Sequence, residues 1–110
     1  AVNVRGEENA AQDLPAHVQN ALFRITQEAL NNIAKHAHAS EASVSLFADG
    51  AAVRLAVSDN GVGFEREELG RGRSSWGLLT MRERAESVGA KFTIESHRGE
   101  GTRVVVEVDR

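Results

Sequence analysis

The chain is organised around one short stretch, residues 59–64, which has the sequence DNGVGF. Apolar and polar side chains alternate over the preceding residues 53–57, and this predicts a strand because successive strand side chains point to opposite faces. The strand would carry the carboxylate of Asp59 to its end, where two glycines follow. Since glycine has no Cβ and tolerates positive φ, a polar ligand can approach such a backbone closely. A plain strand-ending turn explains the stretch equally well.

The elements on either side of this stretch predict an α+β domain. A long helix is expected from Pro15 to about Ala37, with its apolar side chains at the i, i+3, i+4 spacing of one buried face. Asp49 and Gly50 are expected to turn a hairpin. Further strands are predicted over residues 2–5, 42–47, 52–58, 91–96 and 102–108, a second helix over residues 77–88, one helical turn over 65–69 and a mobile loop over 70–75. Two helices on one face of such strands make a two-layer α/β sandwich.

Composition narrows the class of function. At 110 residues the chain is one domain, and its 41% hydrophobic and 26% charged residues are ordinary for a soluble protein. The formal net charge of −3 predicts no general attraction for nucleic acid and no direct contact with an anionic membrane. With no cysteine, a disulfide framework and a thiolate metal site are excluded. We therefore expect a cytoplasmic domain that holds any anionic ligand locally.

The long helix carries a polar constellation. Glu28, Asn32 and His36 are spaced i, i+4, i+8, which predicts a polar stripe along the edge of the apolar face, with Lys35 close by. A carboxylate and a carboxamide one turn apart offer the oxygen ligands that Mg²⁺ accepts. The alternative is that Glu28 and Asn32 are solvated surface residues, while Lys35 and His36 only complement the negative end of the helix.

Four segments in order resemble the GHKL (Bergerat-fold) ATP-binding superfamily. Residues 28–36 (EALNNIAKH) resemble its N box, and residues 59–63 (DNGVG) resemble its G1 box, which has the form DxGxG. Residues 76–85 (WGLLTMRERA) are similar to the G2 region of sensor histidine kinases of the NarL/DesK type, and residues 99–102 (GEGT) resemble the last glycine segment. One departure is Ser75, which stands where a strict GxG pair would have glycine.

The resemblance implies a mixed, mostly antiparallel sheet with helices on one face, and ATP bound with Mg²⁺. Asn32 would be the metal ligand, and Glu28 would either activate the acceptor or orient the site. Asp59 would accept a hydrogen bond from the adenine amine. The remaining residues carried over by position are Thr102 beside the adenine, Gly61 and Gly63 against the base and sugar, Gly77 and Leu78 at the phosphates, and Lys35 and His36 facing the phosphate tail.

The function implied is that of a protein histidine kinase. Residues 1–110 would be the ATP-binding catalytic domain of a two-component sensor kinase, transferring the γ-phosphoryl group of ATP to a histidine on a separate dimerisation domain, for relay to a response regulator. Because the chain has no phosphoacceptor context and no initiating Met, we expect a fragment of a longer protein. The domain is expected to be a monomer within a homodimeric parent, which is either soluble or membrane-anchored. The alternative is a regulatory GHKL module, such as an anti-sigma-like serine kinase or a nucleotide-switch pseudokinase.

Overall fold

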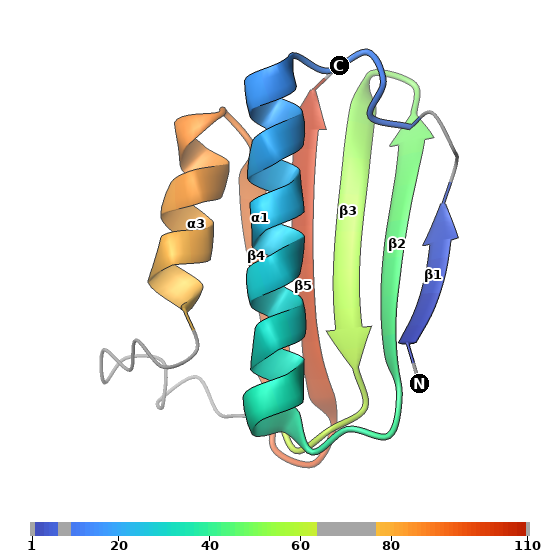
Figure 1. The fold of residues 1–110 in the computed structure, drawn as a ribbon, viewed down its shortest axis with the longest axis vertical. Coiled ribbons are helices and arrows are strands. Elements are labelled where there is room, and N and C mark those ends of the chain that lie inside the picture. The colour runs from blue at the N-terminus through green and yellow to red at the C-terminus, as the bar shows by residue number, and fades with distance from the viewer. Residues whose placement is uncertain (1, 7–9, 64–76, 110) are drawn as a thin grey trace.

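A five-stranded sheet with helices on one face forms the domain (Figure 1). The computed structural model describes residues 2–6, 10–63 and 77–109. The helical turn expected at residues 65–69 and the loop expected at 70–75 lie outside the described residues. In chain order the elements are β1 (Val2–Gly6), α1 (Ala16–Asn32), the π-helix η1 (Ile33–Ala37), β2 (Ala42–Asp49), β3 (Ala52–Asp59), α3 (Leu78–Ser87), β4 (Lys91–His97) and β5 (Gly101–Asp109).

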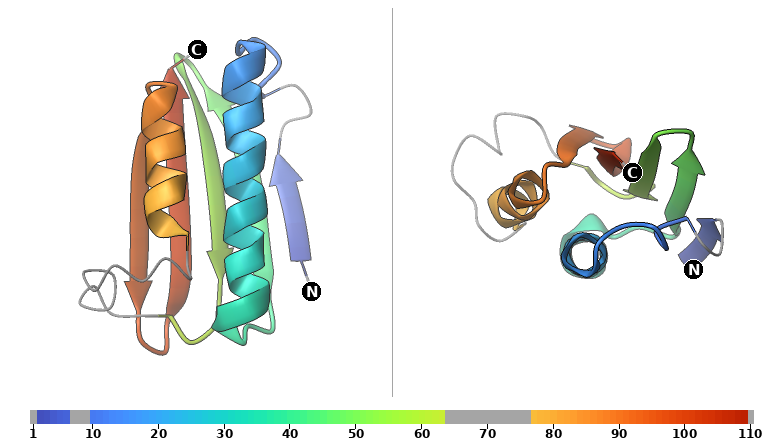
Figure 2. Two further views of the ribbon diagram at one scale, coloured as in Figure 1. Left: turned by 60° about the vertical axis from the view of Figure 1, so that its left-hand side comes forward. Right: turned by 90° about the horizontal axis from the view of Figure 1, so that it is seen from above.

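The strands lie in the order β1-β2-β3-β5-β4. β1 pairs with β2 in parallel, whereas the other neighbouring pairs are antiparallel, which confirms the expected mixed and mostly antiparallel sheet. Both helices cover the same face of this sheet (Figure 2). β2 and β3 are joined through Gly50, whose φ is +56°, and Ala51. The predicted hairpin is therefore confirmed, but its turn lies one residue later than expected because Asp49 still pairs with Ala52.

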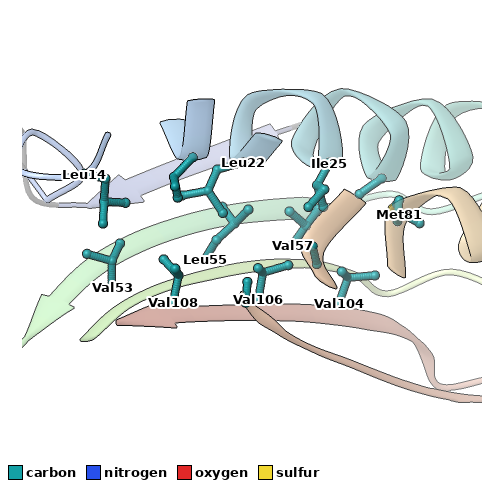
Figure 3. Close-up of a cluster of buried hydrophobic side chains, with 14 residues drawn as sticks. Leu14, Leu22, Ile25, Val53, Leu55, Val57, Met81, Val104, Val106 and Val108 are labelled. Carbon is teal, nitrogen blue, oxygen red and sulfur yellow. The ribbon is translucent and has the colours of Figure 1, made fainter. Parts of the chain in front are cut away.

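The core lies between the helical layer and the sheet. Every second residue of β3 and β5 points toward the helices, as the period of two requires. Ile25 of α1 and Val106 of β5 are fully buried there, and Met81 brings α3 into the same cluster (Figure 3). The other strand residues of this cluster are Val53, Leu55, Val57, Val104 and Val108. The packing fixes α1 across the sheet and so positions the side chains near its carboxyl end.

The long helix changes its geometry before it ends. α1 stops at Asn32, and the next five residues form η1, in which the backbone hydrogen bonds span one residue more than in an α-helix. His38 follows in the left-handed region, with φ of 51°, and reverses the chain toward β2. The predicted helical run to Ala37 is confirmed in extent, but its last part is not α-helical.

Candidate functional site

The opening stretch of the sequence forms the turn that ends β3. The register of β3 and β5 places Asp59 opposite Thr102. The backbone N–H of Gly61 donates to Oδ1 of Asp59 at 2.7 Å. Burial raises the pKa of the Asp59 carboxyl above its ordinary value of 3.8, and the N–H groups of Gly61 and Thr102 oppose this rise. Asp59 is thus a half-buried acceptor held in place by backbone on both sides.

Asp59 and Thr102 share one pocket with residues from both helices. Asn32 comes from α1 and Leu78 is the first residue of α3, and together the four line a narrow pocket of about 10 Å³, room for about one water molecule. The remaining lining residues are aliphatic: Ala29, Ile33, Val57, Ile94 and Val104. Apolar walls with a few fixed polar groups are typical of sites for small organic ligands. The structure thus brings Asp59, Thr102, Asn32 and Leu78 together around one pocket.

Thr102 lines this pocket, and its hydroxyl contacts that of Ser96. The Oγ of Ser96 donates to the carbonyl of Gly101 at 3.1 Å and lies 2.8 Å from Oγ1 of Thr102. Either hydroxyl can donate in this contact; where Ser96 gives its one proton to Gly101, Thr102 donates to Ser96. The lone pairs of Thr102 are then left for a donor in the pocket. Asp59 and Thr102 therefore both suit a ligand that presents an N–H group.

Two glycines bring separate turns into direct backbone contact. Gly63 has a φ of +64°, and a Cβ there would collide with the carbonyl oxygen of His97. Gly101 has a φ of +83°, and a Cβ there would collide with the carbonyl oxygen of Asp59. The N–H of Gly99 donates to the carbonyl of Val62 at 2.6 Å across the same contact. The turn after β3 thus packs on the β4–β5 turn with backbone alone.

Asn60 has a role that the sequence reasoning missed. Its Oδ1 accepts from the N–H groups of Ser40 and Glu41, both at 3.0 Å, and its Nδ2 donates to Oγ of Ser40 at 2.9 Å. Its own N–H donates to the carbonyl of Glu41 at 3.2 Å. Asparagine between an aspartate and a glycine was considered only as a turn residue, although its side chain is well suited to bonding nearby backbone.

The two polar residues of α1 that were grouped in one stripe face different spaces. Asn32 is 6% exposed and is the one buried polar side chain among the residues that the structure describes. Glu28 is half-buried and lines a more open groove of about 400 Å³ between α1 and α3, with Arg24 and Arg84. The interpretation of Asn32 as a solvated surface residue is therefore wrong.

Glu28 also contacts the beginning of α3. Gly77 caps that helix with a φ of 61°, and a Cβ at this position would collide with the carboxylate of Glu28. Lys35 lies in η1 and is exposed. The backbone of His36 belongs to η1 as well, whereas its side chain lies outside the described part of the structure. Glu28 and Gly77 are thus brought together, at the edge of the pocket that Leu78 lines.

The polar groups of this pocket could hold a hard cation together with an anion. Within the described residues no group of three or more histidine, aspartate or glutamate side chains could hold a metal ion. The carboxamide oxygen of Asn32 is a hard donor, and Mg²⁺ is commonly bound by one or two protein oxygens together with substrate phosphates and water. The first turn of α3 supplies N–H groups of the kind that bind phosphate. One end of the pocket thus accepts an N–H donor, and the other suits a metal-bound anion.

Fold and pocket together define a two-layer α/β domain with a pocket between its sheet and its helices. Residues 17–110 match the family described as "Histidine kinase-, DNA gyrase B-, and HSP90-like ATPase". The chain therefore belongs to this family of ATPase domains. The predicted superfamily is confirmed, and with it the use of ATP.

Several proteins with similar sequences are sensor kinases. The chain is 46% identical over 90 residues to sensor histidine kinase YhcY of Bacillus subtilis, covering 82% of this chain and 24% of the relative. It is 42% identical over 91 residues to sensor histidine kinase LiaS of the same organism, covering 83% and 25%. It is 40% identical over 95 residues to sensor protein VraS of Staphylococcus epidermidis, covering 86% and 27%. The chain thus spans about a quarter of the length of these relatives.

A solved structure supports the fold. The histidine kinase domain of a blue-light activated histidine kinase from Erythrobacter litoralis is similar with a TM-score of 0.76 and 23% sequence identity. The match covers 97% of this chain and 50% of that one. The predicted two-layer sandwich is therefore confirmed. None of the helices in the described residues is long and apolar enough to cross a membrane.

Proposed function

We propose that the chain is the ATP-binding catalytic domain of a two-component sensor histidine kinase. It would transfer the γ-phosphoryl group of ATP to a histidine on a separate dimerisation domain, for relay to a response regulator. The observation that carries the proposal is the convergence of Asp59, Thr102, Asn32 and Leu78 on one pocket. Identity of 40–46% to sensor kinases over more than four fifths of the chain supports the same assignment.

The base end of the pocket would select adenine. Asp59 and Thr102 both present acceptors, and the exocyclic amine of adenine is the matching donor. Guanine has a carbonyl at that position, so it would leave the Asp59 carboxylate facing another acceptor. Gly61 and Gly63 keep side chains away from the turn and would let base and sugar lie against the backbone.

The other end would hold the phosphates and the metal. Asn32 would give its carboxamide oxygen to Mg²⁺, which neutralises charge on the phosphate groups. Gly77 and Leu78 would present the N–H groups that begin α3. Lys35 and His36 would face the phosphate tail from η1. Glu28, which contacts Gly77, would orient the phosphate end or activate the acceptor.

The transfer itself would depend on positioning and charge stabilisation, because phosphoryl transfer leaves little covalent chemistry to the protein. The domain would act as a monomer attached to a homodimeric parent in the cytoplasm, with that parent either soluble or membrane-anchored. Assignment to the NarL/DesK branch belongs to the same proposal, because it rests on the resemblance of residues 76–85 to the G2 region of that branch.

Two measurements test the proposal. Calorimetry with ATP, ADP and GTP, each with and without Mg²⁺, is expected to show selective, metal-dependent binding of adenine nucleotides. Labelled ATP mixed with this chain and a dimerisation domain of the same class is expected to label a histidine that resists base and is lost in acid. Binding of ATP without any labelled histidine would refute the kinase and favour a nucleotide switch. Equal binding of GTP would refute the role of Asp59.

A further inference from the structure

Asn60 joins two segments that are twenty residues apart in the chain. Three hydrogen bonds run from its side chain to Ser40 and Glu41, at 2.9–3.0 Å. Both partners lie in the short connection between η1 and β2, and Asn60 follows directly after β3. In Figure 1 the two connections run together at the same end of the domain. The side chain of Asn60 therefore ties the end of the long helix to the turn that begins with Asp59.

Asp59 does not need this tie to keep its place. It pairs with Thr102 through the β3–β5 ladder and accepts from the N–H of Gly61, and neither contact involves the side chain of Asn60. The bonds of Asn60 instead act on the connection at Ser40 and Glu41. Loss of the side-chain bonds of Asn60 should therefore leave Asp59, at the base end of the pocket, in place.

η1 depends on contacts at its two ends. A π-helix is rare because its hydrogen bonds are less favourable than those of an α-helix, and it persists where the surrounding structure holds it. At its beginning, Ile33 packs against the core and follows the buried Asn32. At its end, His38 adopts a left-handed conformation and the chain continues into the connection that Asn60 binds. Asn60 is thus the downstream anchor of η1.

We propose that Asn60 is a positioning residue for the phosphate end of the site, acting through η1. By holding Ser40 and Glu41 it keeps η1 from rewinding or fraying, and so fixes the direction in which Lys35 leaves the backbone. Lys35 is a residue that would face the phosphates, so the inference rests on the proposed function. Asn60 itself would contact neither the base nor the phosphates.

We therefore expect the loss of the Asn60 side chain to weaken the binding of ligands that have phosphates, and not of ligands that lack them. In the Asn60→Ala variant the three side-chain bonds are lost, while the backbone bond from residue 60 to Glu41 remains. Adenosine, which uses the base end alone, should bind this variant within about twofold of the wild type. A magnesium complex of a non-hydrolysable ATP analogue should bind about tenfold more weakly, the loss that one or two net hydrogen bonds correspond to.

Two further variants separate positioning from stability. Asn60→Asp keeps an oxygen that accepts from Ser40 and Glu41, and is expected to restore most of the affinity for the analogue. Ser40→Ala removes the contact with Nδ2 of Asn60 but keeps both bonds to Oδ1, and should behave nearly as the wild type. Amide hydrogen exchange should be faster in Asn60→Ala over residues 33–41 and unchanged in β3 and β5. The thermal midpoint of each variant shows whether the fold is kept.

The experiment is calorimetric titration of the 110-residue chain and these variants with adenosine and with the magnesium analogue. Weaker binding of the analogue alone, with rescue by aspartate, supports the inference. An equal loss for both ligands in Asn60→Ala would overturn it, as would no loss for either or a failure of Asn60→Asp to recover. A wild-type chain that binds neither ligand would refute the proposed function together with this inference, whereas normal binding by Asn60→Ala refutes the inference alone.

Discussion

Replacing Asp59 by asparagine changes one charge at the base end of the pocket and almost nothing else. The new side chain has the same shape, and its oxygen can still accept from the N–H of Gly61, as Oδ1 of Asp59 does at 2.7 Å. What disappears is the charged acceptor that would meet the adenine amine. An asparagine NH₂ group turned toward that amine would place two donors face to face.

The expected loss of affinity follows from that single bond. A hydrogen bond to a charged group contributes about 1.5–3 kcal/mol, so ATP should bind the Asp59→Asn variant roughly 10- to 150-fold more weakly. The wild type should also lose affinity in acid. Because burial raises the pKa of Asp59 above 3.8, its carboxylate becomes protonated at a higher pH than an exposed aspartate would.

The same variant should not be less stable at neutral pH. The folded state raises the pKa of Asp59, so between 3.8 and the higher folded value the native protein binds more protons than the unfolded chain. The free energy of unfolding therefore falls as the pH rises through that window, and above it the ionised Asp59 remains destabilising. The Asp59→Asn variant lacks this destabilising charge, so its free energy of unfolding should not be lower than that of the wild type at pH 7. Any gain in stability should vanish below pH 3.8, where Asp59 is protonated in both the folded and the unfolded wild type.

Calorimetric titration with magnesium ATP and chemical unfolding at several pH values measure both effects. Asp49→Asn provides a matched control, since Asp49 is an exposed aspartate at the opposite end of the β2–β3 pair. It should leave ATP affinity unchanged. Unaltered ATP affinity in Asp59→Asn would refute the adenine assignment. A clear loss of stability at pH 7 would refute the reasoning from burial.

Three other perturbations address the phosphate end and the helix contact. Asn32→Ala should abolish Mg²⁺-dependent transfer in a labelling assay while weakening nucleotide binding less, and its exposed neighbour variant Asn31→Ala should do neither. Chelating Mg²⁺ should weaken calorimetric binding of ATP but leave that of adenosine unchanged. Gly77→Ala should be less stable to denaturant by about 1–2 kcal/mol from its positive φ alone. Gly89→Ala has the same φ penalty with open space around it, so a larger loss at Gly77 would report the collision with Glu28, and equal losses would rule that collision out.

Alternation along the strands was enough to predict the sheet. Each predicted strand is present, with ends that differ by one or two residues. The pattern could not show that β1 runs parallel to β2, because alternation is the same for both directions. It also could not reveal η1, since the apolar spacing of a helix does not distinguish bonds that span four residues from bonds that span five. Both features are decided by tertiary contacts.

The part of the site that could be predicted consists of residues that each come from a separate sequence motif. Asp59, Asn32 and Leu78 meet as expected from their positions at the ends of elements. Glu28 lines the groove between α1 and α3 while Asn32 lines the pocket, because a spacing of four residues leaves 40° of rotation between their directions on the helix. The bonds of Asn60 to Ser40 and Glu41 were missed, since they join segments whose closeness exists only in the folded sheet.

The contact between the two glycine turns bears on the entropy of binding. Gly63 and Gly101 leave no side chain between the turn after β3 and the turn before β5. Ordering a flexible side chain on binding typically costs about 0.5–1.5 kcal/mol, and Gly63 and Gly101 have none to order. A base that bound beside Asp59, as proposed, would meet no such cost at these two positions. The absence of side chains at Gly63 and Gly101 would thus lower the entropic cost of binding at this end of the pocket.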